Sequence, residues 1–282
     1  MRLETTEYRD RWIEILKEKV TTFDRKPFLA IVVADGYSKA SEKYVKNKHI
    51  VAEKIGIETC EFPIEYDKYT TSPEEFIQDV KNVVVALNKH EGIDGIIVQL
   101  PMPYIDENEI ASLIAPEKDV DGFNPVNLGK LMRGEDCLES CTPKGMMDYI
   151  DYLGIDLKGK NVCVVGRSNI VGKPIANMMI NKGATVTVCN SNTQNLIDYT
   201  SCADIVVTAI GKPKYFTKDY FTSRALILDV GINFLDGKMC GDCDYDDLVD
   251  MCDITPVPRG CGQLTLIALM KNVIKAYEMK RG

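Results

Sequence analysis

A tyrosine and a lysine four residues apart could act together on one substrate atom. Tyr44 and Lys48 occur in the run Ser41-Glu-Lys-Tyr-Val-Lys-Asn-Lys48, and residues four apart share one face of a helix. A lysine that is desolvated in a cleft has a lowered pKa and can move protons near neutral pH. Lysines on helices are more often solvated, however. Taken alone, the pair fits either a proton-handling site or an ordinary surface helix.

Further polar side chains follow an apolar stretch. Gln99 lies near the end of the apolar run Gly95-Ile-Ile-Val-Gln-Leu100, the position at which parallel α/β sheets place ligand groups. Its amide could orient a nearby lysine, or could simply face water. Asp119 and Asp121 lie in a charged loop, where a carboxylate could accept two N–H bonds from an aminopyrimidone edge such as that of a pterin. Capping of the loop is the alternative, since Asp-Gly is a common turn pair.

A second motif has the form of a dinucleotide-binding turn. The run Val162-Cys-Val-Val-Gly-Arg-Ser-Asn-Ile-Val-Gly-Lys-Pro174 reads as a strand, a turn with two glycines and a helix start. A glycine at the strand end lets the backbone approach a pyrophosphate, and the helix N-terminus supplies free N–H groups. The full fingerprint has three glycines, so a plain strand–helix turn remains an alternative.

The residues around this turn favour NADP over NAD. Arg167 could pair with the additional ribose phosphate of NADP. The next strand ends in Asn190-Ser-Asn-Thr193, where NAD enzymes usually carry an acidic residue for the ribose hydroxyls. The absence of a carboxylate at this point therefore predicts the phosphorylated cofactor.

Composition limits the possible partners. The chain has 282 residues, is 45% hydrophobic and 27% charged, and has a formal net charge of −8, as expected of a globular protein with no affinity for nucleic acid or anionic membrane. Its apolar runs are too short to span a bilayer. The polar N-terminus lacks the apolar region of a secretory signal. We therefore expect a cytoplasmic protein.

The cysteines predict neither disulfides nor a metal centre. The sequence contains ten, which the cytosol would keep reduced. Cys240-Gly-Asp-Cys243 has the spacing of metal ligands, but the other cysteines are scattered and the only histidines are His49 and His90. Structural zinc sites usually have a second close pair. Free thiols that fill apolar space are the expectation.

Helices and strands alternate almost throughout, which is typical of parallel sheets covered on both faces. In the first half we expect an amphipathic helix at 5–20, with Trp12, Ile13, Ile15 and Leu16 on or near one face, and a buried strand at 28–34. Further helices are expected at 38–55 and 72–87, and strands at 59–64 and 94–100. A loop at 115–125 precedes the change of domain. Strands are then expected at 162–165, 184–189, 204–209 and 225–230, and a final helix at 264–279.

These motifs, in this order, closely resemble the bifunctional methylenetetrahydrofolate dehydrogenase/cyclohydrolase family. The matching blocks are spread over most of the chain and are jointly highly specific. Besides the runs that contain Tyr44 and Gln99, they are Pro116-Glu-Lys-Asp-Val-Asp-Gly-Phe123, Val165-Gly-Arg-Ser-Asn-Ile-Val-Gly-Lys-Pro174, Asp229-Val-Gly-Ile-Asn233, Gly241-Asp-Cys-Asp244 and Thr255-Pro-Val-Pro258.

The resemblance implies a fold and an activity. It implies two α/β lobes with an active-site cleft between them, the second lobe being a Rossmann-type doubly wound parallel sheet. A catalytic, folate-binding domain would comprise residues 1–140 with the C-terminal helix at 264–282, and an NAD(P)-binding domain residues 141–263. The activity would be NADP-dependent oxidation of 5,10-methylenetetrahydrofolate to the methenyl compound and hydrolysis of that compound to 10-formyltetrahydrofolate. A homodimer is also implied.

The resemblance also implies roles for individual residues. Lys48 would handle the proton in the hydrolysis, supported by Tyr44 and Gln99. The residues implied to contact the folate are Tyr44, Gln99, Asp121, Pro258 and Gly260. The residues implied to bind NADP are Gly166, Arg167, Ser168, Ser191 and Ile232, the last at the nicotinamide end.

Departures from the family pattern leave alternatives open. The family usually reads Pro-Gly-Gly-Val-Gly-Pro-Met-Thr near its C-terminus, but here Pro258 is followed by Arg259-Gly-Cys-Gly-Gln-Leu-Thr265. Gln263 thus replaces a proline, and Asn190 replaces a common histidine. An arginine in that loop could clash with ligands or could recruit an additional anion. The alternatives are a family member that uses NAD, one with weakened cyclohydrolase activity, and a catalytically silent dinucleotide-binding protein.

Overall fold

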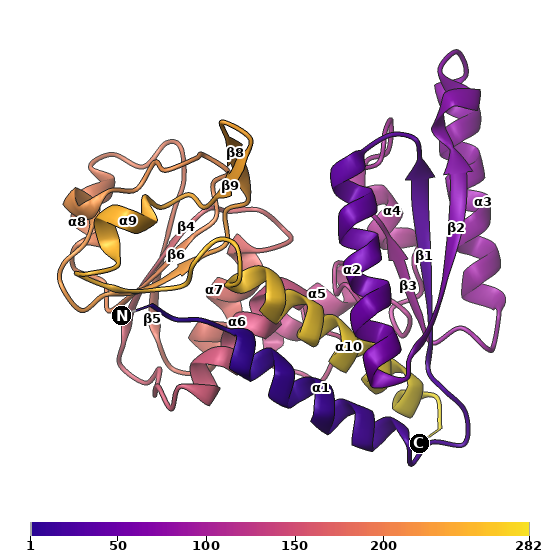
Figure 1. Cartoon of the computed structure of the whole chain (residues 1–282), viewed down its shortest axis with the longest axis horizontal. Helices are drawn as coiled ribbons and strands as arrows, with labels where there is room; N and C mark the ends of the chain where they lie inside the picture. Colours follow the sequence, from indigo (N-terminus) through magenta and orange to yellow (C-terminus); the bar gives the residue numbers. More distant parts are fainter. Residues whose placement is uncertain (1, 282) are drawn as a thin grey trace. The chain divides into compact units, whose positions relative to one another are not determined.

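Parallel strands in two separate sheets form the framework of the chain (Figure 1). The computed structural model describes residues 2–281, apart from the side chain of Ala40. The chain divides into two units. The three-stranded unit consists of Arg11–Lys130, Asp136–Cys141 and the residues from Leu269 onward. The five-stranded unit consists of the residues up to Asp10 together with Leu131–Glu135 and Thr142–Ala268.

The three-stranded unit contains one parallel sheet in the order β2-β1-β3. The central strand β1 (Phe28–Asp35) pairs on one side with β2 (Glu58–Glu65) and on the other with β3 (Gly95–Val98). The helix α2 (Lys39–Ile55) connects β1 to β2, and α3 (Pro73–Lys89) connects β2 to β3. Successive side chains of β1 are buried on both faces of the sheet, and its nearly continuous apolar run is the pattern expected for such a parallel strand.

The core of this unit forms where α3 covers one face of the sheet. Ala30 and Val32 of β1 are fully buried against side chains that recur every three or four residues along α3, the spacing that places them on one helical face. These α3 residues are Phe76, Val80, Val84 and Leu87. Each strand is too short to be stable alone, so packing of this apolar face orders the sheet.

Several polar contacts within this unit hold the end of the last helix, α10 (Cys261–Met279). The carboxylate of Asp94, at the start of β3, is fully buried and accepts two hydrogen bonds from the Arg25 guanidinium at 2.7 and 2.8 Å. Lys280 lies 3.3 Å from the same carboxylate. These charge-assisted bonds offset the cost of burying Asp94, and the pKa of Asp94 lies below its usual value although burial opposes this shift.

The five-stranded unit contains a parallel sheet in the order β10-β7-β6-β4-β5. Strands β4 (Asn161–Val165) and β5 (Thr185–Cys189) are joined by α7 (Gly172–Asn181), whereas the strands that follow extend the sheet on the other side of β4. These are β6 (Ile205–Thr208), β7 (Leu226–Asp229) and β10 (Asp253–Ile254). The strand order reverses at β4, and this switch point is where ligands bind to open α/β sheets.

The remaining elements are short or connect the two sheets along the chain. They are α1 (Thr6–Val20), η1 (Tyr66–Tyr69), α4 (Glu107–Leu113), α5 (Pro125–Arg133), α6 (Cys141–Tyr152), α8 (Leu196–Thr200), η2 (Lys218–Tyr220), the hairpin β8 (Asn233–Leu235) with β9 (Lys238–Cys240), and α9 (Tyr245–Leu248).

The predicted fold class, two α/β units of which the second is a Rossmann-type sheet, is confirmed, with three local corrections. Ile15 is 39% exposed, because it lies about 200° around α1 from the buried Ile13. The predicted loop at 115–125 contains a β-bridge between Asp119 and Ile96, and α5 begins at its last residue. The final helix begins at Cys261 and not at residue 264, since the amide of Gln263 already bonds to the carbonyl of Gly260 at 2.9 Å.

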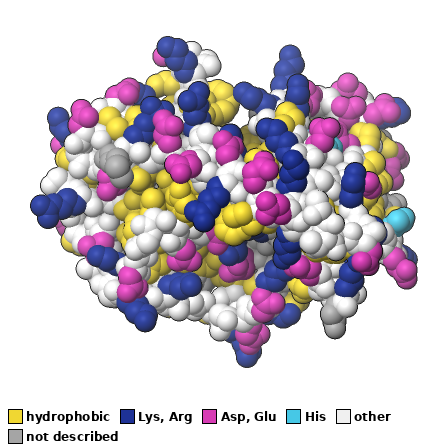
Figure 2. Space-filling model, turned by 60° about the horizontal axis from the view of Figure 1, so that its bottom comes forward, with side chains coloured by type: hydrophobic (Ala, Val, Ile, Leu, Met, Phe, Trp, Pro, Cys, Tyr) yellow, Lys and Arg dark blue, Asp and Glu magenta, His cyan; other side chains and the backbone are white. Residues whose placement is uncertain are grey.

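Charges of both signs are mixed over the surface seen in Figure 2. Lysine and arginine side chains alternate there with acidic side chains, and small hydrophobic areas lie between them. None of the helices within residues 2–281 combines the length and the apolar character that crossing a bilayer would require.

Candidate active site

The amine of Lys48 lies at the carboxyl end of the three-stranded sheet. Its Nζ donates a hydrogen bond of 2.7 Å to Oε1 of Gln99, the residue directly after β3. The Gln99 amide nitrogen donates to the carbonyl of Leu100 at 2.7 Å, so its oxygen is the atom turned toward the amine. The structure therefore brings together two of the predicted residues, from α2 and from the end of β3.

Tyr44 and Asp121 differ from ordinary surface groups in their ionisation. Both side chains are half-buried. Desolvation raises the pKa of the Tyr44 hydroxyl, which therefore stays protonated and able to donate. Desolvation also raises the pKa of Asp121, and the nearby positive charge of Lys48 acts in the opposite direction. Lys48 and Asp121 thus interact electrostatically in a partly desolvated environment, which is characteristic of functional sites.

Hydrogen bonds from α10 hold the segment that carries Asp121 in place. The side chain of Asn272 donates hydrogen bonds to the carbonyls of Val120, at 2.9 Å, and of Glu139, at 2.7 Å. The amide of Cys141 bonds to the carbonyl of Asp121 at 3.2 Å. Sequence reasoning did not identify Asn272, because an asparagine inside an amphipathic helix carries no local signal of a partner some 150 residues earlier.

Asp119, two residues before Asp121, organises its own loop. Its carboxylate is 1% exposed and accepts hydrogen bonds from the Asn124 amide at 2.8 Å and the Asn127 side chain at 3.0 Å. Burial outweighs these bonds and raises the pKa of Asp119 to about 6. Of the two readings open for Asp119, loop capping is the one that the structure supports.

This burial predicts a pH dependence of stability. The folded chain binds the Asp119 proton more tightly than the unfolded chain, so the stabilisation by this group is complete below about pH 4 and is lost as the pH rises through about 6. Relative to Asp119→Asn, the wild type should lose about 2–3 kcal/mol of unfolding free energy between about pH 4 and pH 7. Urea denaturation of both proteins across this range measures the difference, and a difference independent of pH would contradict the assignment.

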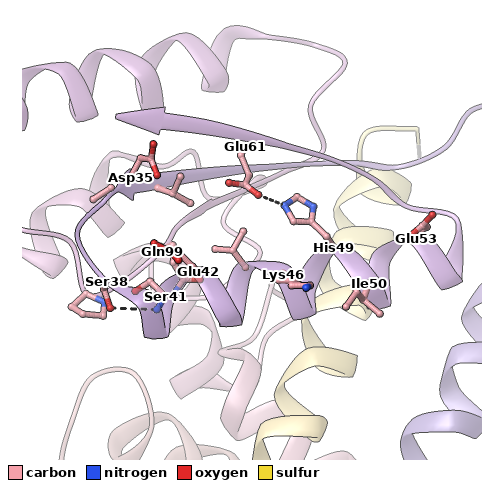
Figure 3. A pocket seen from close by; sticks show the side chains of 14 residues that line it. Asp35, Ser38, Ser41, Glu42, Lys46, His49, Ile50, Glu53, Glu61 and Gln99 are labelled. Atoms are coloured by element: carbon pink, nitrogen blue, oxygen red, sulfur yellow. Dashed lines mark hydrogen bonds and ion pairs between the residues drawn. The ribbon is translucent and has the colours of Figure 1, made fainter. Parts of the chain in front are cut away.

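A separate cavity of about 260 Å³ lies between α2 and the strands β1 and β2 (Figure 3). His49 projects into it from α2 and contacts Glu61 of β2 at 2.7 Å. Asp35, Glu42 and Glu53 add further carboxylates to its lining. Gln99 and Ser41 reach this cavity, but Lys48, Tyr44 and Asp121 are not among its lining residues. Its acidic lining makes it unsuited to an anionic ligand.

Two glycines shape the turn after β4 in the five-stranded unit. Gly166 has a φ of 137°, a value that residues with a side chain rarely adopt. A methyl group on Gly166 would lie 2.5 Å from the carbonyl oxygen of Ala209. A methyl group on Gly172 would overlap the carbonyl oxygen of Gly166. Close backbone approach at these two positions leaves a cradle of main-chain groups in front of α7, of the kind that accommodates a pyrophosphate.

Ser168 closes this turn with its side chain. Its Oγ accepts hydrogen bonds from the amides of Val171 at 3.2 Å and Gly172 at 3.4 Å, so its hydroxyl hydrogen is left to donate to a ligand. Arg167 and Ser191 are exposed, and Ile232 is 43% exposed. These residues follow β4, β5 and β7, and because the strands are parallel they lie at one edge of the sheet. The structure thus places all five predicted NADP residues along the carboxyl edge.

Two buried carboxylates, to which the sequence analysis gave no role, hold the loop of Ile232. Asp229 accepts hydrogen bonds from the amides of Gly231, Asp242 and Cys243 at 2.9–3.1 Å, and burial raises its pKa to about 6. Asp242 accepts from the amides of residues 210–212 and from Asn233. Both aspartates belong to blocks already noted in the sequence, where the available signal was a glycine directly before Asp242 and two residues after Asp229.

The remaining predicted substrate residues follow β10 in the five-stranded unit. Pro258 is exposed and Gly260 is buried, and a methyl group on Gly260 would overlap the carbonyl oxygen of Pro256.

All ten cysteines are free thiols. Within residues 2–281, no group of three or more His, Cys, Asp or Glu side chains is arranged to hold a metal ion.

These features define an α/β protein with a dinucleotide cradle on one unit and a half-buried lysine on the other. Two family profiles match the chain. One, described as the catalytic domain of tetrahydrofolate dehydrogenase/cyclohydrolase, matches residues 3–121, and the other, described as its NAD(P)-binding domain, matches residues 140–281. The bifunctional protein FolD of Bacillus anthracis is 42% identical over 269 residues, which are 93% of this chain and 91% of that protein.

Solved structures agree with this result. The bifunctional FolD methylenetetrahydrofolate dehydrogenase/cyclohydrolase of Campylobacter jejuni has a TM-score of 0.93 at 34% identity and covers 99% of both chains. The Trypanosoma brucei enzyme, solved with NADP and an inhibitor, has a TM-score of 0.90 at 30% identity, covering 100% of this chain and 98% of that one. The chain belongs to the tetrahydrofolate dehydrogenase/cyclohydrolase family, and the predicted family and enzyme class are confirmed.

Proposed function

We propose that this chain oxidises 5,10-methylenetetrahydrofolate with NADP and hydrolyses the methenyl product to 10-formyltetrahydrofolate, with Lys48 as the proton-handling group. Folate binding is assigned to the domain of residues 1–140 with 264–282, and NADP binding to residues 141–263. The observation that carries the assignment is the contact of 2.7 Å between Lys48 Nζ and Gln99 Oε1, beside a carboxylate on which the lysine charge acts.

For the oxidation, the chain supplies binding and alignment. Bound NADP supplies the two-electron acceptor, and no protein base is required. The amide groups of the turn and the Ser168 hydroxyl would hold the pyrophosphate, while Ile232 would contact the nicotinamide end. Alignment of the folate methylene carbon is the main contribution of the protein, because fixing the reacting atoms removes most of the entropic barrier.

For the hydrolysis, Lys48 manages the proton released when water adds to the methenyl carbon. Water forms a C–O bond to this carbon, a C–N bond of the ring breaks, and one proton leaves. The Lys48 amine, oriented by Gln99, moves protons between the attacking water and the departing ring nitrogen. Tyr44, kept protonated by desolvation, donates a hydrogen bond to the substrate, and Asp121 accepts N–H bonds from the pterin edge.

Ser41 extends this set. It lies three residues before Tyr44 and seven before Lys48, so the three side chains follow one stripe of α2. Its hydroxyl is buried and has no hydrogen-bond partner among residues 2–281, which costs about 1–3 kcal/mol when uncompensated. Ser41 lines the acidic cavity that Gln99 also reaches, so a neutral polar group of the folate, and not its carboxylates, would bond to this hydroxyl and remove the cost on binding. If Ser41→Ala left the KM for folate unchanged, Ser41 would have no such role.

The preference for NADP is assigned to Arg167. Its exposed guanidinium follows the strand that carries the cradle, and the loop of Ser191 has no carboxylate to repel a phosphate. In Arg167→Gln we expect KM for NADP to rise about tenfold, the value of one charge-assisted bond, with KM for NAD unchanged. Rates of methylenetetrahydrofolate oxidation with each cofactor measure this. Equal rises for NADP and NAD would assign Arg167 to the shared pyrophosphate and contradict the proposal.

These assays also separate the alternatives. A family member that uses NAD would have the lower KM for NAD in the wild type. Weakened cyclohydrolase activity would appear as oxidation without hydrolysis of added methenyltetrahydrofolate. A silent dinucleotide-binding protein would bind NADP and turn over neither folate.

A homodimer in the cytoplasm is also proposed. Among residues 2–281, strand β5 pairs with β4 alone, so its other edge presents unpaired backbone groups, which commonly pair with a second chain. Val188 on this strand is 40% exposed, and Ile197 and Tyr199 of the following helix α8 are 44% and 42% exposed. Free thiols throughout the chain suit a reducing compartment. A solution mass of 31.6 kDa, that of one chain, would contradict the dimer.

A further inference from the structure

Arg259 occupies a backbone conformation that disfavours any side chain. Its φ is 79°, in the left-handed region that glycine adopts freely and other residues adopt at a cost in free energy. The surrounding chain holds it there. The Thr5 hydroxyl oxygen lies 2.9 Å from the Arg259 carbonyl and 3.1 Å from the Gly260 carbonyl, and its single hydrogen is donated at this turn. Arg224 shares this conformation, so the strain does not by itself mark a function, and what Arg259 can bind depends on its charge and its place in the sheet.

The charge of this side chain is not used within the protein. Arg259 is exposed, and no ion pair or side-chain hydrogen bond joins its guanidinium to any other group in residues 2–281. Its five N–H donors are therefore available to an anion, and their planar fork matches a carboxylate in bidentate geometry.

The position of Arg259 argues against the cofactor phosphates as that anion. Arg259 follows β10, and in the strand order β10-β7-β6-β4-β5 the cradle after β4 is three strands away. At about 4.8 Å per strand this is about 14 Å along the sheet edge. The ribose phosphate site is assigned to Arg167 and Ser191, which follow β4 and β5. These strands are three and four positions away from β10, so this site is also distant from Arg259 along the sheet edge. An anion bound by Arg259 would therefore belong to the other ligand.

We propose that Arg259 binds the glutamyl carboxylates of the folate substrate and thereby sets the preference for glutamylated folates. This inference rests on the proposed function. Arg259 stands between Pro258 and Gly260, both assigned to substrate contact, and the glutamyl end of a folate carries the carboxylates that a guanidinium recognises. The pterin end carries no carboxylate, so the two ends of the ligand can be tested separately.

The chain offers a matched control in Arg224. It too is an exposed arginine with a left-handed backbone, at φ 97°, and it belongs to the same unit. It precedes β7, so it lies at the amino edge of the sheet, opposite the edge of Arg259. Replacing either arginine by glycine removes one positive charge and relieves the same kind of backbone strain, but only Arg259→Gly should affect folate binding.

The experiment measures binding of tetrahydrofolate and of the methylamide of tetrahydropteroate, which has neither the glutamyl group nor a carboxylate, to the full chain in the presence of NADP. In Arg259→Gly we expect tetrahydrofolate to bind about fivefold more weakly, the upper value for a partly solvated ion pair, and the methylamide to bind as in the wild type. The wild-type preference should decline with added salt. Arg259→Lys should retain part of it, and Arg224→Gly should match the wild type for both ligands.

Three results would overturn the proposal. Equal weakening for both ligands would place Arg259 at the pterin or in the fold, and no weakening would remove it from recognition. A raised Kd for NADP with unchanged folate binding would assign it to a cofactor phosphate. If the wild type bound neither pteridine, the proposed function itself would fail, a result distinct from these three. Melting temperatures of both glycine variants at or above that of the wild type would show that the fold is intact.

Discussion

Replacing Lys48 by methionine is expected to slow the hydrolysis of methenyltetrahydrofolate by about 10²–10⁴-fold, the range for loss of a general acid–base group. Methionine has a similar length but cannot accept or donate the proton, and it leaves Gln99 Oε1 without its donor at 2.7 Å. The Kd of NADP should not change, because the cradle residues belong to the other unit. Initial rates of methenyl hydrolysis and titration with NADP measure the two effects.

Lys46→Met provides the control for this variant. Lys46 lies on the same helix and is exposed, whereas the hydrogen bond to Gln99 comes from Lys48. Replacing Lys46 removes the same charge and adds the same side chain. Hydrolysis should proceed at the wild-type rate. An equal loss of hydrolysis rate in both variants would mean that the charge or the stability of α2 causes the loss. An unchanged rate in Lys48→Met would mean that Lys48 takes no part in the mechanism.

Gly172→Ala is expected to have the largest effect on the cofactor. The added methyl group would overlap the carbonyl oxygen of Gly166 and approach the amide of Arg167 at 2.9 Å. Both are backbone groups, so the turn itself must shift. Displacing groups by about 1 Å in a binding site can cost about 10²-fold, and overpacking costs about 1–3 kcal/mol of stability. We expect NADP affinity to fall by about 10²-fold and the melting temperature to decrease.

A glycine with open surroundings serves as the comparison. A methyl group on Gly129, within α5, would meet no atom within 4 Å. Gly129→Ala should therefore leave NADP affinity unchanged and slightly stabilise the helix, because alanine is favoured over glycine there. Calorimetric titration of NADP into each variant checks both expectations. Wild-type affinity in Gly172→Ala would mean that the cofactor does not depend on the shape of this turn.

Most strands and long helices were predictable because local pattern determined them. The apolar run at 28–34 became the central strand β1, and the four strands predicted after residue 160 each lie within two residues of the observed ends. The exposure of Ile15 could also have been predicted, from its angular position around α1 relative to Ile13. By contrast, the hairpin of β8 and β9 consists of three-residue strands, too short for periodicity to reveal.

Part of the candidate site could be predicted from the sequence because the residues of each group lie within a single motif. Tyr44 and Lys48 share a helical turn, and the two glycines belong to one strand–helix connection. The meeting of Lys48 and Gln99 depends on β1 and β3 being neighbours, which spacing alone does not determine. The buried Asp229 and Asp242 and the contacts of Asn272 depend on segments distant in sequence, so their roles could be found only with the chain folded.

The most direct test of the account is to record NADPH formation and methenyltetrahydrofolate together after methylenetetrahydrofolate and NADP are mixed with the wild type or with Lys48→Met. The account predicts that the wild type forms NADPH with little accumulation of the methenyl compound. In the variant, NADPH should form while the methenyl compound accumulates in nearly equal amount. Absence of NADPH formation in the wild type, or hydrolysis that keeps pace with oxidation in the variant, would contradict it.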